Sequence, residues 1–139
     1  MSTSEKKPAD LVDELKARAG SEAIASFLNM NLLELSPGYA RVSMKVISEY
    51  QNFNGMTFGG IIMSVADQAF AYASNSLSFP SVASQFNLHF ISGANAGDEL
   101  IAECRVIKSG KRVGLSEMTV SNQDGKLIAR ATGTTIPTG

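Results

Sequence analysis

One carboxylate, Asp67, stands alone in a stretch that is otherwise free of charge from residue 51 to residue 76. The small and apolar residues around it are typical of a buried helix, and removing a carboxylate from water costs several kcal/mol unless a partner compensates it. A carboxylate that faces a ligand-accessible cleft can act as a nucleophile or as a general base. This stretch is therefore the first place to look for a functional site.

Two consecutive glycines, Gly59 and Gly60, stand at the predicted start of the same helix. Each glycine in a helix costs about 0.5–1 kcal/mol relative to alanine, so the pair needs a physical reason. Close approach of another backbone is one common reason. The other is close approach of a ligand oxygen to the free N–H groups at the N-terminus of the helix, where partial positive charge stabilises a developing oxyanion.

The spacing between Gly59 and Asp67 limits how the two could act together. With a rise of about 1.5 Å per residue, the eight positions between them correspond to roughly 12 Å along the helix axis. One helix cannot place both groups on one carbonyl. A two-fold dimer with antiparallel, side-by-side helices can, because the Asp67 carboxylate of one chain then lies near the glycines of the other. If the pair is catalytic, the sequence predicts a dimer with shared sites.

The elements that position these residues can be predicted from hydrophobic periodicity and turn residues. Leu11, Leu15 and Ala19 recur at helical spacing from Asp10, and Gly20 marks the end of this first helix. The pattern then predicts a short helix over 22–28, a hairpin that turns at 36–38, a loop over 52–58, a long helix over 59–75, and strands near 82–90, 98–108, 113–121 and 126–136. This order predicts one α+β domain over residues 1–139, with a disordered tail over 1–7 and the long helix on one face of an antiparallel sheet.

The long helix and the strand after it are predicted in more detail. Thr57 is the expected N-cap of the helix. Small residues on nearly all sides predict a helix that is enclosed on most sides, including by another subunit. Its core stripe is predicted to be Ile62, Val65, Ala66, Ala69, Phe70 and Ala73. Alternation along the strand predicts one face with Val82, Ser84, Phe86, Leu88 and Phe90, and another with Ala83, Gln85, Asn87 and His89.

Composition excludes several classes of function. Lysine and arginine number 12 and aspartate and glutamate number 13, so no net field favours nucleic acid or a membrane surface. No run of apolar residues is long enough for a membrane span. The single cysteine, Cys104, is expected to be a core thiol, and no Cys/His cluster has metal-ligand spacing. A cytoplasmic protein without a metal is expected.

The segment 52–76, followed by PSVASQFNLHFISGANAGDELIAECRVIKSGKRVGLSEMTVSNQDGKLIARATG, closely resembles the hotdog-fold thioesterases of the PaaI-like, phenylacetate-pathway family. The likeness covers about residues 30–136. In that family an Asn lies fifteen positions before a catalytic Asp, and an HGG tripeptide opens the central helix. Asn52 and Asp67 keep this spacing, and Gly59 and Gly60 supply the last two members of the tripeptide.

The resemblance implies a hotdog fold, in which a curved antiparallel sheet of five or six strands wraps a long helix, with dimers that pair into tetramers. It implies hydrolysis of an aromatic or medium-chain acyl-CoA to the free acid and CoA, with no cofactor beyond the CoA of the substrate. The Gly59 amide would polarise the thioester carbonyl, and Gly60 would help to form the turn. Asp67 from the neighbouring chain would be nucleophile or general base, and Asn52 would orient the water or the carbonyl.

Two positions depart from the family pattern. Phe58 occupies the position of the family histidine, so rate and substrate choice are expected to differ. Ala83 stands where some relatives carry a serine that assists catalysis.

Phe58 is also a candidate for binding the substrate, together with residues elsewhere in the chain. The turn with Lys108, Lys111 and Arg112 corresponds to one that lies near the phosphates of CoA in the family, although such turns are usually only solvated. Asn87, with Gln85, could contact the pantetheine arm, or could belong to a polar sheet face. Met63, with Met56, could line an acyl pocket, although methionine more often fills core gaps.

Two other functions remain open from the sequence. The protein could be a non-catalytic acyl-CoA-binding or sensing protein, with Phe58 marking lost chemistry. A hotdog hydratase or dehydratase would pair a histidine with a carboxylate near the helix, and the sole histidine, His89, stands in a predicted strand instead.

Overall fold

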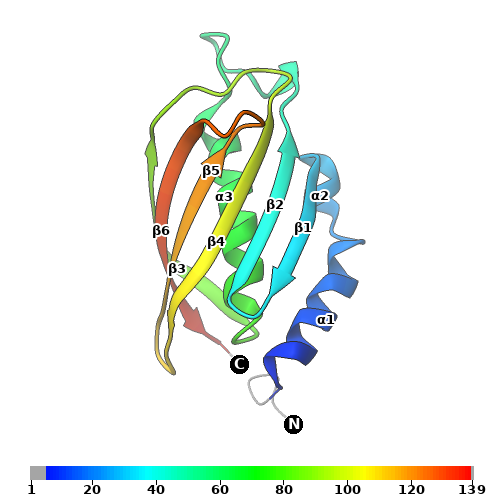
Figure 1. The fold of residues 1–139 in the computed structure, drawn as a ribbon, viewed down its shortest axis with the longest axis vertical. Helices are drawn as coiled ribbons and strands as arrows, with labels where there is room; N and C mark the ends of the chain where they lie inside the picture. Colours follow the sequence, from blue (N-terminus) through cyan, green and yellow to red (C-terminus); the bar gives the residue numbers. More distant parts are fainter. Residues whose placement is uncertain (1–5, 139) are drawn as a thin grey trace.

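A computed structural model describes residues 6–138, which form one six-stranded sheet with a long helix on its concave face (Figure 1). The elements are α1 (Pro8–Ala19), α2 (Ala23–Phe27), β1 (Met30–Ser36), β2 (Tyr39–Lys45), a 3₁₀ turn (Ser48–Tyr50), α3 (Gly59–Asn75), β3 (Ser81–Phe90), β4 (Glu99–Ser109), β5 (Gly114–Ser121) and β6 (Leu127–Pro137). The predicted α+β class, the hairpin and the bounds of the long helix are confirmed.

The sheet has the strand order β1-β2-β4-β5-β6-β3, and each neighbouring pair is antiparallel. It curves around α3, with β1 and β3 as its two edges, while α1 and α2 lie beside β1 (Figure 1). Short turns join β1 to β2, β4 to β5 and β5 to β6, whereas α3 lies in the connection that runs from β2 to the opposite edge strand, β3. The architecture confirms the expected hotdog arrangement of a curved sheet around one helix.

The apolar stripe of α3 forms the centre of the core. The six residues predicted for this stripe are all buried, namely Ile62, Val65, Ala66, Ala69, Phe70 and Ala73. Phe70 packs against Phe86 of β3 with ring centroids 5.9 Å apart. Cys104 of β4 is fully buried, as predicted, and burial raises the pKa of its thiol to about 12.

The opposite face of α3 is open in the single chain. Met63, Asp67 and Ala71 follow one another at four-residue spacing and are all exposed. This chain encloses α3 on the side that faces the sheet and on the side where Gln68 and Tyr72 contact Glu22, and it leaves the stripe of Met63, Asp67 and Ala71 open. A stripe of this kind remains available to a partner.

Two details of the prediction are wrong. Thr57 does not cap α3, because its buried hydroxyl donates to the carbonyl oxygen of Ala94 at 2.7 Å, and Phe58 is the N-cap residue. A bulge between Ala83 and Gln85 breaks the alternation of β3. Val82 consequently pairs with exposed Ile136 and does not share the inward face of Phe86.

The N-terminal segment is only partly described. Residues 1–5 of the predicted disordered tail lie outside the described residues. Lys6 pairs with Glu14 of α1 at 2.7 Å, and α1 begins at Pro8, two residues before the predicted start. Within residues 6–138, no helix has the length and apolar character to cross a membrane.

Gly133 of β6 provides a test of the core packing. An added Cβ atom there would lie 2.6 Å from Cζ of Phe70, whose side chain is almost fully buried. We expect Gly133→Ala to lower the free energy of unfolding by about 1–3 kcal/mol, because the ring has no space into which to move. Gly20→Ala is the matched control, since nothing lies within 4 Å of its added Cβ atom. Chemical denaturation would measure both, and equal stability of the two variants would contradict this packing.

Candidate active site

The start of α3 is held from two sides. The N–H of Phe58 donates to the carbonyl of Tyr50 at 2.8 Å, and both the N–H and the hydroxyl of Thr57 donate to the carbonyl of Ala94. Gly59 and Gly60 follow as the first helical residues, and their N–H groups have no acceptor among residues 6–138. Two fixed, unpaired donors at the positive end of a helix dipole are suited to stabilising an oxyanion.

Two phenyl rings lie against the glycine pair. An added Cβ atom at Gly59 would lie 3.0 Å from Cζ of Phe90, the last residue of β3. An added Cβ atom at Gly60 would lie 2.7 Å from Cε2 of Phe58. The close neighbours of the glycine pair are therefore aromatic side chains rather than another backbone, and the N–H groups remain free between them.

Asn52 shapes the loop that leads to this turn. Its side-chain oxygen accepts from the N–H groups of Asn54 at 2.9 Å and Met56 at 3.2 Å. Its amide nitrogen has no acceptor in the described part of the chain and remains available as a donor. Asn52 and Gly59 line the same hollow of about 370 Å³, which is closed on its other side by Phe90 and the loop that follows β3. The structure thus brings together two of the predicted catalytic residues.

Asp67 lies apart from this hollow. It stands two turns further along α3, on the outward stripe, and solvent reaches its side chain. The composition of this stretch predicted a buried carboxylate, whereas the Asp67 side chain is exposed in the single chain. Neighbouring atoms nevertheless exclude part of its hydration, and this desolvation raises the pKa of Asp67 above its ordinary value. The geometry agrees with the inference that one chain cannot place Asp67 and Gly59 on one carbonyl.

The predicted substrate-binding residues lie in three separate places. Phe58 and Met63 lie on or next to the first turns of α3 and are both exposed. The basic turn with Lys108, Lys111 and Arg112 joins β4 to β5, at the end of the sheet opposite the start of α3 (Figure 1). Within one chain these three side chains do not approach Gly59.

Asn87 lies on the convex face of the sheet, away from α3. It pairs with exposed Thr132, whose neighbour Gly133 faces the ring of Phe70 on the concave side. His89 shares the convex face and lines a hollow there with Arg130. The suggested contact of Asn87 with a pantetheine arm therefore stays a prediction.

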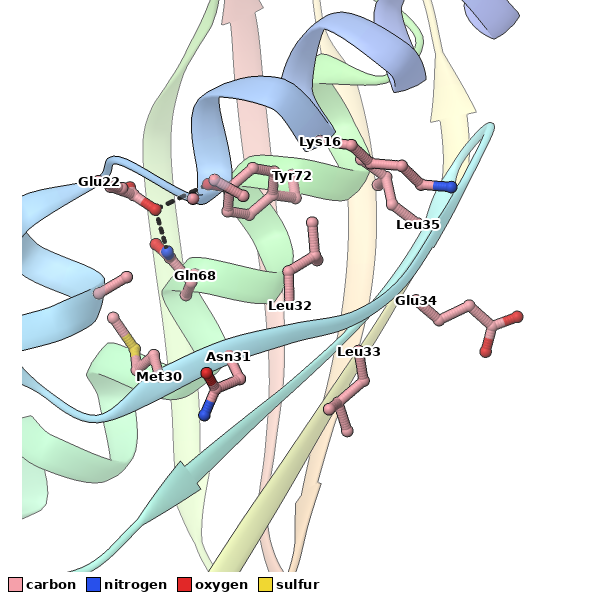
Figure 2. Close-up of a pocket in the computed structure, with 13 residues that line it drawn as sticks. Lys16, Glu22, Met30, Asn31, Leu32, Leu33, Glu34, Leu35, Gln68 and Tyr72 are labelled. Carbon is pink, nitrogen blue, oxygen red and sulfur yellow. Dashed lines mark hydrogen bonds between the residues drawn. The ribbon is translucent and has the colours of Figure 1, made fainter.

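A further hollow of about 500 Å³ lies between β1, α3 and the connection from α1 to α2 (Figure 2). Glu22 accepts hydrogen bonds there from the Gln68 amide at 2.6 Å and the Tyr72 hydroxyl at 2.7 Å. Burial and the Glu22 carboxylate both raise the pKa of Tyr72. No pattern in the sequence relates Glu22 to Gln68, because this contact depends on tertiary packing across 46 positions.

Sequence reasoning also missed Phe90 as a neighbour of the site. Alternation indicated only that Phe90 faces inward, and its contact with Gly59 depends on where β3 ends relative to α3. Asn29 has a left-handed backbone conformation, with φ 54°. This turn could have been predicted from the sequence, since asparagine is enriched in that conformation.

The curved sheet around one helix, with free amides at the start of that helix, defines a hotdog-fold protein. A family model described as the thioesterase superfamily matches residues 54–129, which is more than half of the chain. The chain belongs to the thioesterase superfamily, and it is an enzyme of the thioester hydrolase class.

Individual relatives agree with this family. The chain is 35% identical to the acyl-coenzyme A thioesterase PaaI of Escherichia coli over 109 residues, 78% of this chain and 78% of that protein. The solved structure of the E. coli PaaI protein from the phenylacetic acid degradation operon matches with a TM-score of 0.89, at 30% identity, over 96% of this chain and 97% of that one. The structure of smu.793 from Streptococcus mutans, bound to acetyl CoA, matches with a TM-score of 0.78, at 28% identity, over 81% of this chain and 91% of that one.

The raised pKa of Asp67 predicts a change in the pH dependence of stability. The folded chain binds this proton more tightly than the unfolded chain does, so ionisation destabilises the fold as the pH rises from 3.8 through the folded pKa. The neutral amide of an Asp67→Asn variant carries no such charge. We therefore expect Asp67→Asn to unfold at a higher temperature than the wild type at about pH 7, with the difference shrinking towards about pH 3. Thermal unfolding at both pH values measures this, and a difference that grows on acidification would contradict it.

Proposed function

We propose that the protein hydrolyses the thioester of an aromatic or medium-chain acyl-CoA, releasing the free acid and CoA. The observation that carries this proposal is the pair of unpaired N–H groups at Gly59 and Gly60, next to a hollow that Asn52 also lines. A thioester carbonyl placed there gains negative charge on its oxygen as the carbonyl carbon is attacked, and fixed donors stabilise that charge.

The reaction needs a carboxylate, and none lines the hollow that Asn52 and Gly59 share within the described residues. In the proposed mechanism the partner's Asp67 either attacks the carbonyl carbon, giving an anhydride that water then cleaves, or removes a proton from an attacking water. Asn52 donates from its amide nitrogen to the water or to the carbonyl oxygen. In both routes the C–S bond breaks, the CoA thiolate takes up a proton, and the acid leaves.

The exposed surfaces of β3 and α3 support a two-fold symmetric dimer whose subunits meet along β3. β3 is an edge strand that is exposed over most of its length, and the stripe of Met63, Asp67 and Ala71 is also open. Antiparallel pairing of two β3 edges would place the two α3 helices antiparallel, so that each Asp67 faces the first turn of the other helix. Two such dimers would form the expected tetramer, in a cytoplasmic setting.

The same arrangement gives the basic turn a role. Ser81 at the start of β3 pairs with Pro137, and Gly114 pairs with Thr135, so the β4–β5 turn and the start of β3 lie at one end of the sheet. Antiparallel pairing would bring that end of the partner towards Gly59 of this chain. Lys108, Lys111 and Arg112 would then approach the phosphates of CoA, with Asn87 as the candidate contact of the pantetheine arm.

Relatives support the substrate class. The E. coli relative carries the name acyl-coenzyme A thioesterase and belongs to a phenylacetic acid degradation operon, and the S. mutans protein was solved with acetyl CoA bound. Phenylacetyl-CoA is therefore included among the substrates to test.

Loss of the carboxylate is expected to remove turnover. We expect wild-type protein to release free thiol from at least one member of a panel of aromatic and medium-chain acyl-CoAs, and Asp67→Asn to lose nearly all of that turnover while it remains folded. Asp124→Asn, in the turn between β5 and β6, is the matched control and should retain activity. Full activity of the Asp67→Asn variant would contradict the catalytic role proposed for Asp67. If the wild type instead binds CoA esters saturably without turnover, the protein is the non-catalytic acyl-CoA-binding protein that the loss of the family histidine at Phe58 suggests.

A shared site predicts that two inactive variants rescue one another. Asn52→Ala and Asp67→Asn remove groups that the proposal assigns to different chains of one site. After dissociation and random reassociation, half of the dimers are mixed, and each mixed dimer has one intact site, so about a quarter of the full activity should return. Activity of the mixture would be compared with that of each variant alone. No recovery, with mixed dimers demonstrated by differential tagging, would place all the groups within one chain.

A further inference from the structure

A second hollow lies on the other side of the first turn of α3, and most of its lining residues are apolar or aromatic. Its volume is about 440 Å³, and Glu49 is its one charged lining residue within the described chain. The apolar and aromatic side chains that line it are Phe27, Leu28, Ile47, Tyr50, Phe58 and Ile61. Phe27 is 77% exposed and Phe58 is 57% exposed, so this wall presents large apolar groups to solvent.

Hydrogen bonds to Tyr50 fix the residues that line this hollow. The hydroxyl of Tyr50 accepts from the amide of Asn29 at 3.0 Å and donates to the carbonyl of Phe27 at 3.4 Å. Asn29 has the left-handed backbone conformation that lets the chain turn from α2 into β1. The carbonyl of Tyr50 accepts from the N–H of Phe58. The end of α2 and the start of α3 are thus fixed to the same tyrosine, and the hollow between them is preformed.

The two hollows that flank the first turn of α3 differ in aromatic content. The hollow on the Phe90 side has one aromatic ring and the polar side chains of Asn52, Thr57 and Ser92. The hollow on the Phe58 side has three aromatic rings, with Glu49 and Gln51 at its polar edge. A thioester whose oxygen lies on the amides of Gly59 and Gly60 has one apolar substituent, the acyl group, and one amide-bearing substituent, the CoA arm.

From this difference we infer that the Phe27–Phe58 hollow takes the acyl group of the substrate, and that the CoA arm leaves past Asn52 and Ser92. This inference rests on the proposed thioester hydrolysis. The Phe58 ring connects the two parts, because it packs over Gly60 and also lines the hollow. Phenylalanine at this position thus supplies an apolar wall to the acyl group.

The size of the hollow selects the acyl class. An apolar cavity of about 150 Å³ is sufficient to bind benzene, so a hollow of about 440 Å³ has room for a phenyl ring or a medium-length chain. An acetyl group adds only a methyl to the carbonyl, so it has little apolar surface to bury against the rings of Phe27 and Phe58. Phe27 and Phe58 are therefore assigned to selection between long and short acyl groups.

Phe27→Ala tests this inference with little risk to folding, because the side chain is mostly exposed. We expect kcat/KM for octanoyl-CoA and for phenylacetyl-CoA to fall roughly tenfold, while the value for acetyl-CoA stays at the wild-type level. Phe27→Leu should restore most of the loss, because leucine keeps an apolar wall. Ile24→Ala is the matched control, since Ile24 is an exposed residue of the same short helix that does not line the hollow.

The outcomes distinguish failure of the acyl assignment from failure of the proposed hydrolysis. Turnover with the same acyl preference in Phe27→Ala as in the wild type would overturn the acyl assignment and leave the proposed hydrolysis standing. Unchanged acyl preference together with a smaller assembly by light scattering would overturn it as well, and would identify the hollow as a contact with a second copy of the chain. Absence of turnover by the wild type on every acyl-CoA would overturn the proposed hydrolysis, and the acyl assignment with it.

Discussion

The start of α3 is fixed by backbone contacts on both sides, and the rest of the site depends on this constraint. The buried hydroxyl of Thr57 bonds to Ala94 after β3, while Phe58 bonds to Tyr50 before the helix. The first N–H groups of a helix have no carbonyl one turn earlier to bond, and those of Gly59 and Gly60 have no other acceptor among residues 6–138. A donor that is fixed without its own partner is costly when buried, and useful when a ligand supplies the acceptor.

Much of the fold could be predicted because its signals are local. The glycine pair begins α3, the stripe from Ile62 to Ala73 repeats at helical spacing, and Gly125, at φ 78°, closes the predicted turn between β5 and β6. The failures concern contacts that depend on distant parts of the chain. The hydroxyl of Thr57 finds an acceptor 37 residues away, and the bulge after Ala83 depends on how β3 fits against β6. Local propensity carries no information on either.

The candidate site could be predicted in its components but not in its surroundings. Asn52 was identified by its match to the family pattern and Gly59 by its place at the start of a helix, and the structure brings them to one hollow. The rings of Phe58 and Phe90 that enclose the glycines could not be placed, because each reaches α3 through a loop or a strand end whose position is set by packing. The exposure of Asp67 was also missed, since a small and apolar composition does not distinguish burial by the same chain from burial by another.

Phe90 couples the edge of the sheet to the first turn of α3. It is the last residue of β3, an edge strand, and its ring rests on Gly59. This contact joins the edge of the sheet to the first residue of α3 through a single side chain. A substitution at Phe90 therefore changes the end of the edge strand and the surroundings of the Gly59 N–H group at the same time.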